Sequence, residues 1–555
     1  MDIQRLITFL VFSFSLLLLW EAWQKEQRPV PQQPASAASS VNQGTVPSPI
    51  PSATVSAALP QVVSTSVEKS AAQAQVERIK VQTDLVRAEI SPVGGDIVYL
   101  ELLKHRDTVD ENKNLVLLGP EHKFTAQSGL TGDGFPNHKT TYSASGGEFK
   151  LADGKDSIEV RLDAVGSGNA SGVRVTKIIT FRRDSYLIEV SHQVSNTSAQ
   201  PVSTNAYFQL TRDGKAPAGD SKMVSTYTGA AVYSEQDKFH KVDFSDIEKN
   251  KVSYTTVTNN GWIAIVQHYF VTAVLPPLQT QREYYSRKLA DNLYAVGAIL
   301  PVASIAPGAR GEIKTSIYAG PEEQDKLKSI ATGLELSVDY GWLTVIAAPL
   351  FWVLQYLYAW LGNWGLAIIL LTVIIKLIFF PLSAASYKSM AKMKLVTPKM
   401  TKIREQYAND RMKQNQAMMD LYKEEKINPL GGCLPIVVQI PVFISLYWVL
   451  LASVELRHAP FYGWITDLAA ADPYFILPAL MMASMVIQTR MNPTPPDPVQ
   501  AKVMQIMPIA FGVMFFFFPA GLVLYWLVNN VLSIAQQWQI TKMIEGEKAT
   551  TSAKR

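Results

Sequence analysis

A single lysine interrupts a long apolar segment in the C-terminal half of the chain. Lys376 is the only charged residue between Trp342 and Tyr387, and the residues around it from 366 to 380 are otherwise apolar except for Thr372. A charge at the centre of a membrane helix costs about 2.5–3.5 kcal/mol on insertion scales, so it usually faces protein or water and serves a function. The alternative is a lysine near a helix end whose amine reaches the lipid headgroups. If Lys376 faces protein or water, its charge would attract acidic groups.

A second set of polar residues lies in the last apolar segment of the chain. They recur every three or four positions, which places them along one face of a helix: Trp526, Asn529, Asn530, Ser533, Gln536 and Gln537. Thr372 lies one turn from Lys376 on the same helix face, and Gln439 and Gln488 add one polar group each to other apolar segments. Polar groups on several helices favour a wet groove around the lysine. The alternative is a set of hydrogen bonds that hold membrane helices together.

Long apolar segments would position these residues. Several approach the ~20 residues that span a bilayer, and they occur at 342–361, 364–382, 430–451, 474–490, 501–518 and 520–538. Lysines and arginines crowd the segment 384–427, which the positive-inside rule places in the cytoplasm. The aromatic residues of 342–361 suit a helix at the outer interface, whereas a seventh span there would conflict with this orientation. The sequence therefore predicts six spans with both termini in the cytoplasm.

The remaining segments differ in composition. Residues 1–24 predict an uncleaved signal anchor rather than a cleaved signal peptide, because the Ala35–Ala37 site lies too far beyond the apolar run. Residues 25–78 are rich in Pro, Gln, Ser and Ala, which predicts a disordered linker. Residues 79–320 alternate with period two between frequent turns, which predicts a large antiparallel β-sandwich outside the membrane. We expect amphipathic or interfacial helices at 321–361, a helical core at 362–541 and a basic cytoplasmic tail at 542–555.

The basic segment 384–427 predicts a helical hairpin with a turn at Asn409–Asp410. Apolar residues at three- and four-residue steps form one stripe on each predicted helix. The hairpin could be a simple antiparallel pair with a solvated basic face. It could instead dock a nascent chain, a ribosome or anionic lipids, because methionine is flexible and suits varied contacts. The candidate docking residues are Met390, Met393, Met400, Met418 and Met419.

Three motifs carry a resemblance to a known family. Residues 381–393 (PLSAASYKSMAKM), 428–443 (NPLGGCLPIVVQIPVF) and 518–526 (FPAGLVLYW) resemble the YidC/Oxa/Alb family of membrane-protein insertases. The signal anchor and large outer domain resemble the form of this family in Gram-negative bacteria, whose periplasmic domain is similar to the β-supersandwich of galactose mutarotases. The resemblance implies a multi-domain protein of the inner membrane with six transmembrane helices, five of which form a core around a hydrophilic groove.

The resemblance also implies a role for particular residues. The groove's positive residue falls on Lys376, where the family usually has arginine, and its substrate-contacting residues fall on Thr372 and Trp526. Gln439 matches a polar groove position. The family inserts and folds inner-membrane proteins, alone or beside the Sec translocon, so the implied partners are nascent membrane proteins, the translocon, ribosomes and anionic lipids. No enzyme activity, cofactor, metal or nucleic-acid specificity is expected.

Two other function classes remain as alternatives. A secondary transporter could use Lys376 as an ion or substrate site, although such proteins commonly show internal repeats and we find none here. A sugar-modifying enzyme could reside in the outer domain. Its histidines are scattered singly and nothing marks a nucleophile, which argues against this class.

Overall fold

The described residues of the computed structural model fall into two compact units, divided between Val338 and Asp339. The structure describes residues 47, 77–110, 112–219, 226–251, 253–408, 410–425, 434–492 and 498–552. Three predicted parts of the chain lie outside these residues. They are the signal anchor, nearly all of the linker, and residues 428–433, which begin the motif at 428–443. Each unit is described below by itself.

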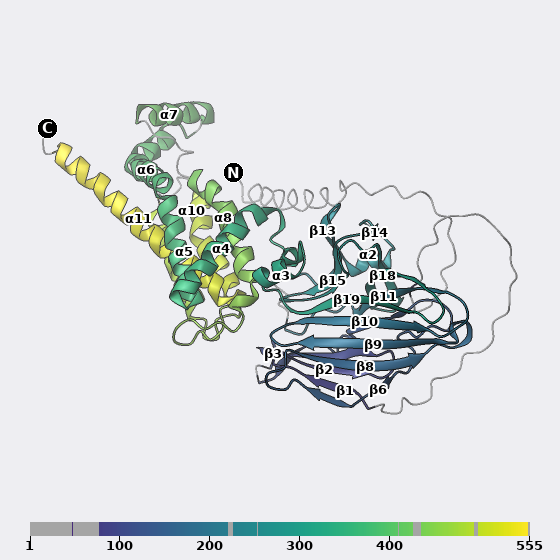
Figure 1. The fold of residues 1–555 in the computed structure, drawn as a ribbon. Coiled ribbons are helices and arrows are strands. Elements are labelled where there is room, and N and C mark those ends of the chain that lie inside the picture. Colours follow the sequence, from purple (N-terminus) through teal and green to yellow (C-terminus); the bar gives the residue numbers. More distant parts are fainter. Residues whose placement is uncertain are drawn as a thin grey trace. The chain divides into compact units, whose positions relative to one another are not determined.

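The first unit is a sandwich of two mostly antiparallel sheets (Figure 1). Among the described residues, the 10-stranded sheet has the order β14-β17-β18-β11-β5-β3-β2-β1-β7, with β4 paired to β3. Its strands are β1 Ile79–Gln82, β2 Val86–Ser91, β3 Asp96–Arg106, β4 Asn114–Leu118, β5 Thr125–Leu130, β7 Glu148–Lys150, β11 Val202–Asp213, β14 Val257–Thr258, β17 Arg282–Ala290 and β18 Leu293–Ile305. The predicted large β-sandwich is therefore confirmed.

The second sheet of the sandwich has nine strands among the described residues, in the order β13-β12-β15-β16-β19-β10-β9-β8-β6. They are β6 Ser143–Ala144, β8 Ser157–Val165, β9 Val173–Arg182, β10 Leu187–Asn196, β12 Gly229–Ser234, β13 Lys238–Val242, β15 Trp262–Gln267, β16 Phe270–Leu275 and β19 Arg310–Pro321. Strict alternation in β8 shows why these segments form strands, since every second side chain is buried between the sheets while its neighbours are exposed. Short helices complete the unit: η1 Gly168–Ala170, α2 Phe244–Glu248, α3 Gln324–Ile330 and η2 Leu334–Ser337.

A buried ion pair joins the two sheets. The Lys177 amine of β9 lies 3.6 Å from a carboxylate oxygen of Asp96 on β3. It also donates hydrogen bonds to the carbonyl oxygens of Gly94 at 2.8 Å and Ser128 at 3.2 Å. Lys177 is 1% exposed and Asp96 is 4% exposed, so the pair is removed from solvent. One lysine thus bridges the interior from one sheet to the other.

The second unit is helical. Its elements are η3 Gly341–Leu343, α4 Thr344–Leu361, α5 Trp364–Ile378, α6 Phe380–Gln406, α7 Arg411–Glu424, α8 Leu434–Ala452, η5 Val454–Leu456, α9 Ile476–Met491, α10 Pro498–Met514, η6 Phe515–Phe517 and α11 Ala520–Ser552. The chain bends by 67° between α5 and α6, so the helix predicted at 364–382 ends at Ile378. Pro381 stands in the first turn of α6, where its missing N–H costs no hydrogen bond.

The predicted number of spans is not confirmed by helix length. Within the described residues, one helical stretch, Gly341–Leu361, is long and apolar enough to cross a membrane, or two are if the bent pair α5 and α6 counts as one span. Shorter apolar helices occur at Val438–Ala452, Ile476–Met491 and Ala501–Phe517. The helix α4 packs on α5 and α8 and leaves Trp352, Tyr356 and Trp360 exposed. The six-span layout therefore stays a prediction.

Candidate functional site

Lys376 points into the helical unit and contacts the last helix. Its amine donates a hydrogen bond to the hydroxyl oxygen of Ser533 on α11, with 2.7 Å between the two atoms. The Ser533 hydroxyl in turn donates to the carbonyl oxygen of Asn529, also at 2.7 Å. Lys376 is only 5% exposed, which does not fit the alternative of an amine that reaches out to a membrane surface. The fold thus brings the lysine together with a residue 157 positions later, on the polar face of α11.

No carboxylate compensates the Lys376 charge within the described part of the chain. The amine is largely buried, and no charged side chain of the described residues acts on it. A buried ammonium group needs hydrogen-bond acceptors or an opposite charge to offset its lost hydration. Ser533 supplies one acceptor out of the three that an ammonium group can use. The remaining N–H groups of the amine can therefore donate hydrogen bonds to a further acidic or polar partner.

The bent helix α6 adds polar residues that sequence reasoning missed. The side chain of Tyr387 lies beside that of Ser533. Ser383 and Ser386 are buried on the same helix, four residues and one residue before it. Ser386 and Tyr387 follow Ser383 by three and four residues, and this spacing is the signal that could have identified them. The polar cluster therefore draws side chains from α5, α6 and α11.

A third helix, α9, also contacts the polar face of α11. The side-chain amide of Asn530 donates to the Ser484 hydroxyl at 3.2 Å. Gln537 donates in the same way to the side-chain oxygen of Asn492 at 3.0 Å. Neither Ser484 nor Asn492 was predicted, because no periodic pattern marks them as partners of residues 45 or 46 positions away.

The other predicted groove residues take different positions. Thr372 is 1% exposed, and its hydroxyl donates to the Ile368 carbonyl of its own helix at 2.7 Å. Trp526 is half-buried between aromatic rings, with ring centroids 4.2 Å from Phe443 on α8 and 4.7 Å from Phe515. Gln439 is half-buried on α8, and Asn529 is half-buried on α11. Asn530 and Ser533 share the buried face with Gln537.

The methionines of the predicted docking hairpin lie mostly inside it. Met400 is buried with Val396 and Leu421, and Met393 and Met418 pack against this cluster between α6 and α7. Met390 is half-buried near the Ser386 hydroxyl, whereas Met419 is 59% exposed. Three of the five side chains thus serve the contact between the two helices, and the docking role stays a prediction that rests on exposed residues such as Met419.

The composition of both units gives no metal site. Among the residues that the structure describes, no group of three or more His, Cys, Asp or Glu side chains could hold a metal ion. The chemistry that the site offers is electrostatic and hydrogen-bonding: one buried cation, several hydroxyls and side-chain amides, and an aromatic cluster at Trp526. Such a set can bind and orient a polar or acidic segment without changing a covalent bond.

Known proteins match both parts of the chain. The family described as the YidC periplasmic domain matches residues 78–353, and the family described as 60Kd inner membrane protein matches residues 356–548. The protein named membrane protein insertase YidC of Dechloromonas aromatica (strain RCB) is 54% identical, with 100% of both chains covered. Its namesake in Nitrosospira multiformis is 55% identical over 100% of this chain and 99% of that protein.

A solved structure is similar as well. It is described as an active YidC insertase with the first transmembrane domain resolved, and it is 19% identical over 84% of this chain and 92% of its own. Its TM-score is 0.39. The full-length identity to the two curated relatives carries the assignment, and the chain belongs to the YidC family of membrane protein insertases.

Proposed function

We propose that this protein inserts and folds proteins of the bacterial inner membrane from the cytoplasmic side, alone or beside the Sec translocon. The observation that carries the proposal is Lys376, a buried amine with a serine hydroxyl as its acceptor and no carboxylate beside it among the described residues. A groove around this cluster would give a substrate's polar tail a hydrated, positively charged place within the membrane. The function requires no covalent chemistry.

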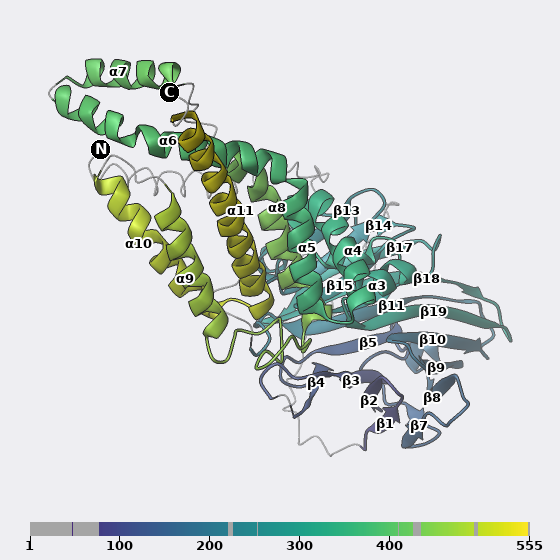
Figure 2. The same cartoon turned by 90° about the vertical axis from the view of Figure 1, so that its left-hand side faces the viewer.

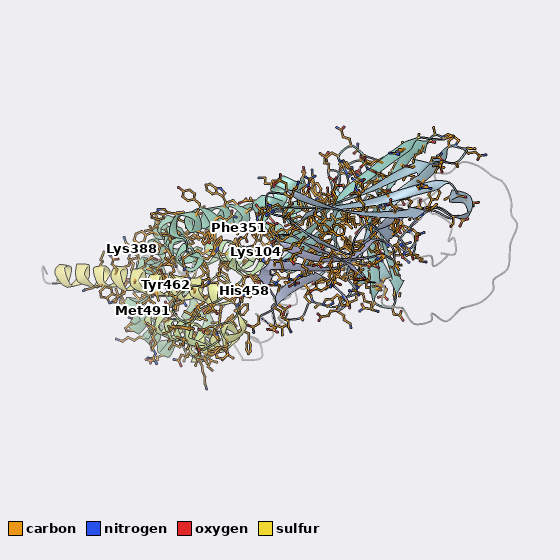
Figure 3. All side chains as sticks on the ribbon, turned by 60° about the horizontal axis from the view of Figure 1, so that its bottom comes forward. Lys104, Phe351, Lys388, His458, Tyr462 and Met491 are labelled. Carbon is orange, nitrogen blue, oxygen red and sulfur yellow. The ribbon has the colours of Figure 1, made fainter. Side chains whose placement is uncertain are left out.

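The proposed topology has six spans, with both termini in the cytoplasm and the β-sandwich in the periplasm. Lys388 and Met491 lie toward the same end of the helical unit, and His458 lies toward the other end (Figure 3). The lysine-rich helices α6 and α7 adjoin the first of these ends, which the positive-inside rule assigns to the cytoplasm. The second end, with the loop between α8 and α9, then faces the periplasm.

The mechanism follows from the cost of moving polar groups out of water. A short polar tail loses hydration when it enters a bilayer, and polar walls lower this cost. Lys376 attracts acidic groups of the tail, and Ser533 holds its amine in place. The following apolar segment then moves into lipid because its own burial is favourable. The charge binds weakly enough for release, since no second cation accompanies Lys376 among the described residues.

The basic hairpin suits transient cytoplasmic partners. Lys388, Lys394 and Lys402 are exposed on α6, and Met419 is exposed on α7. Such a surface attracts anionic lipids and ribosomal RNA through charge, without sequence-specific contacts. We propose nascent membrane proteins, the Sec translocon, the ribosome and anionic lipids as partners.

Reconstitution in liposomes tests the function directly. Purified full-length protein should insert a short phage-coat-type substrate without any energy source, measured as protease protection of the substrate. The second candidate function is secondary transport with Lys376 as the ion or substrate site, which its buried charge permits. Solute flux across the vesicles without substrate insertion would reject the insertase and support the transporter.

Ser533→Ala provides a smaller test of the site. The change removes the acceptor that orients the Lys376 amine, and a hydrogen bond to a charged group contributes about 1.5–3 kcal/mol. We expect the insertion rate for substrates with acidic tails to fall about 3–10-fold, because only part of this energy differs between the free and the occupied site. Ser445→Ala is the matched control, since Ser445 is also buried and bonds the carbonyl four residues earlier, but lies on α8. Equal loss in both variants would reject the orienting role.

A further inference from the structure

The helices α9 and α10 form one body beside α11 (Figure 2). α9 packs on α11 through a face that includes the buried residues Leu477, Met481 and Ser484. α10 packs closely on α9, because a Cβ atom at Gly512 would come within 2.6 Å of the Met482 side chain. The rest of α10 is largely exposed, with apolar side chains that suit lipid: Val503, Ile506, Met507, Ile509, Phe511 and Val513. We call α9 and α10 together the α9–α10 leaf.

The periplasmic end of the leaf is fixed to α11 through the backbone. The amide groups of Ala520 and Gly521, at the start of α11, donate to the carbonyl oxygens of Ala470 and Leu468 at 2.7 and 2.8 Å. These bonds satisfy two of the free N–H groups that every helix start presents. An isolated β-bridge pairs Ala471 with Pro519 at the same place.

A buried aspartate fixes the start of α9. Asp472 is 1% exposed, and its carboxylate accepts hydrogen bonds from the backbone of Tyr474 at 3.0 Å and of Leu477 at 2.7 Å. It also accepts one from the indole of Trp464 at 3.0 Å. Phe515, at the periplasmic end of α10, packs on Trp526 of α11. Both helices of the leaf are therefore held firmly at this end.

Toward the cytoplasmic end the polar contacts with α11 are between side chains. Ser484 accepts from Asn530, and Asn492 accepts from Gln537 two turns further along α11. Gln537 and Asn530 lie on the same face as Ser533, the residue that binds the Lys376 amine. In this structure α9 thus covers part of the polar face on which the proposed groove depends.

We propose that the α9–α10 leaf pivots at residues 470–477 and that the pairs Asn530–Ser484 and Gln537–Asn492 latch it closed over the polar face of α11. Opening releases two side-chain amides beside Ser533, and the polar tail of an entering substrate takes over their hydrogen bonds. The leaf closes again when the substrate has left. This regulation rests on the proposed insertase function and describes how its site becomes accessible.

The strengths of the contacts fit a reversible latch. Apolar packing between membrane helices has little hydrophobic driving force, since lipid tails replace it at low cost. Each interhelical hydrogen bond contributes modestly, so two of them favour the closed leaf over the open one by about tenfold. A substrate that satisfies the freed amides offsets that bias. The backbone bonds and the buried aspartate at the pivot have no such replacement.

Crosslinking of the full-length protein tests the proposal. In a Cys433→Ser background, the pair Asn492→Cys and Gln537→Cys is bridged by a short thiol crosslinker, which joins the latch. Insertion of a short acidic-tailed substrate into liposomes is compared between the bridged protein and the same protein left unbridged. We expect bridging to lower the insertion rate at least tenfold. The matched control bridges Ala471→Cys and Pro519→Cys at the pivot, where bridging should change the rate by less than twofold.

The possible outcomes distinguish failure of the proposed leaf movement from failure of the proposed insertase function. Bridged latch protein that inserts at the unbridged rate would overturn the leaf and leave the insertase function standing. If neither the unbridged variants nor the wild-type protein inserts substrate, the proposed function fails. A spin-label distance between α9 and α11 that stays constant when substrate is added would also overturn the leaf, whatever the insertion rates are. An increase in that distance for wild-type protein supports it.

Discussion

Lys376→Glu should abolish insertion of substrates with acidic tails, while Lys376→Arg should preserve it. The glutamate reverses the charge in a site with one hydroxyl acceptor and no compensating cation among the described residues. An acidic tail would then meet a like charge where it now meets an opposite one, and like charges at close range in a poorly hydrated site repel strongly. Arginine keeps its positive charge in any protein environment, so it should serve at least as well.

Growth of cells depleted of their own insertase measures this effect in vivo, and liposome insertion measures it in vitro. We expect Lys376→Glu to lower insertion of acidic-tailed substrates at least 100-fold, and Lys376→Ala to lower it about tenfold, since a tenfold change corresponds to ~1.4 kcal/mol. Lys104→Glu, a matched charge reversal at an exposed lysine of the β-sandwich, should have no effect. Equal activity of the Glu, Ala and Arg variants on every substrate would reject Lys376 as the charge of the groove.

At pH 7–8, where both groups carry their charges, Lys177→Met should destabilise the β-sandwich by about 3–5 kcal/mol, the usual cost of breaking a buried ion pair. The change leaves Asp96 buried with no counter-charge and removes the donor for the carbonyls of Gly94 and Ser128. The double variant Asp96→Asn with Lys177→Met should lose much less, because no uncompensated charge then remains in the interior. Hydrogen exchange of β3 and β9 amides in the full-length protein measures the free energy of opening.

Lys326→Met is the matched control for this pair. Lys326 forms an exposed ion pair with Glu323 at 2.9 Å, and exposed pairs contribute at most about 1 kcal/mol. A loss at Lys177 no larger than that at Lys326 would show that the bridge between the sheets contributes nothing to stability. A double variant less stable than Lys177→Met would contradict the explanation by an uncompensated charge.

The same pair should make the stability of the sandwich depend on pH. Burial raises the pKa of the Asp96 carboxyl from 3.8 to about 7, against the attraction of Lys177. Between these values the folded protein holds a proton that the unfolded chain releases, so stability falls as the pH rises. Burial lowers the pKa of the Lys177 amine from 10.5 to about 8, so stability rises again between pH 8 and 10.5. We expect a minimum near pH 7–8 that disappears in the double variant.

Part of the site could be predicted because its residues break a local pattern. Lys376 stands out because a charge in an apolar segment is costly, and Asn530 and Ser533 stand out because polar residues recur along one helix face. Thr372 was predicted on the same face as Lys376, yet its hydroxyl bonds its own helix. Ser484 and Asn492 could not be predicted, since each is an ordinary polar residue in its own segment.

The helical hairpin of α6 and α7 could also be predicted only in part. The apolar stripes of α6 and α7 were visible as residues three and four apart, and the sequence left open whether methionines served docking or packing. The structure places Met393, Met400 and Met418 between the two helices, where they fill the contact. Flexible side chains suit either role, so residue type could not decide between them. The packing around these methionines does decide between the two roles.

Local patterns in the sequence were enough to predict the β-sandwich and a helix with one positive charge in an apolar segment. Alternation with period two set β9 and β10 as neighbouring strands, and apolar length with one lysine set α5 as a helix whose charge needs protein or water. The tertiary structure decided the partners: Ser533 for Lys376, Asp96 for Lys177 and Ser484 for Asn530. These contacts join residues 46 to 157 positions apart. The periodicity of one segment fixes which face is polar, but only the packing of whole helices and sheets fixes what that face meets.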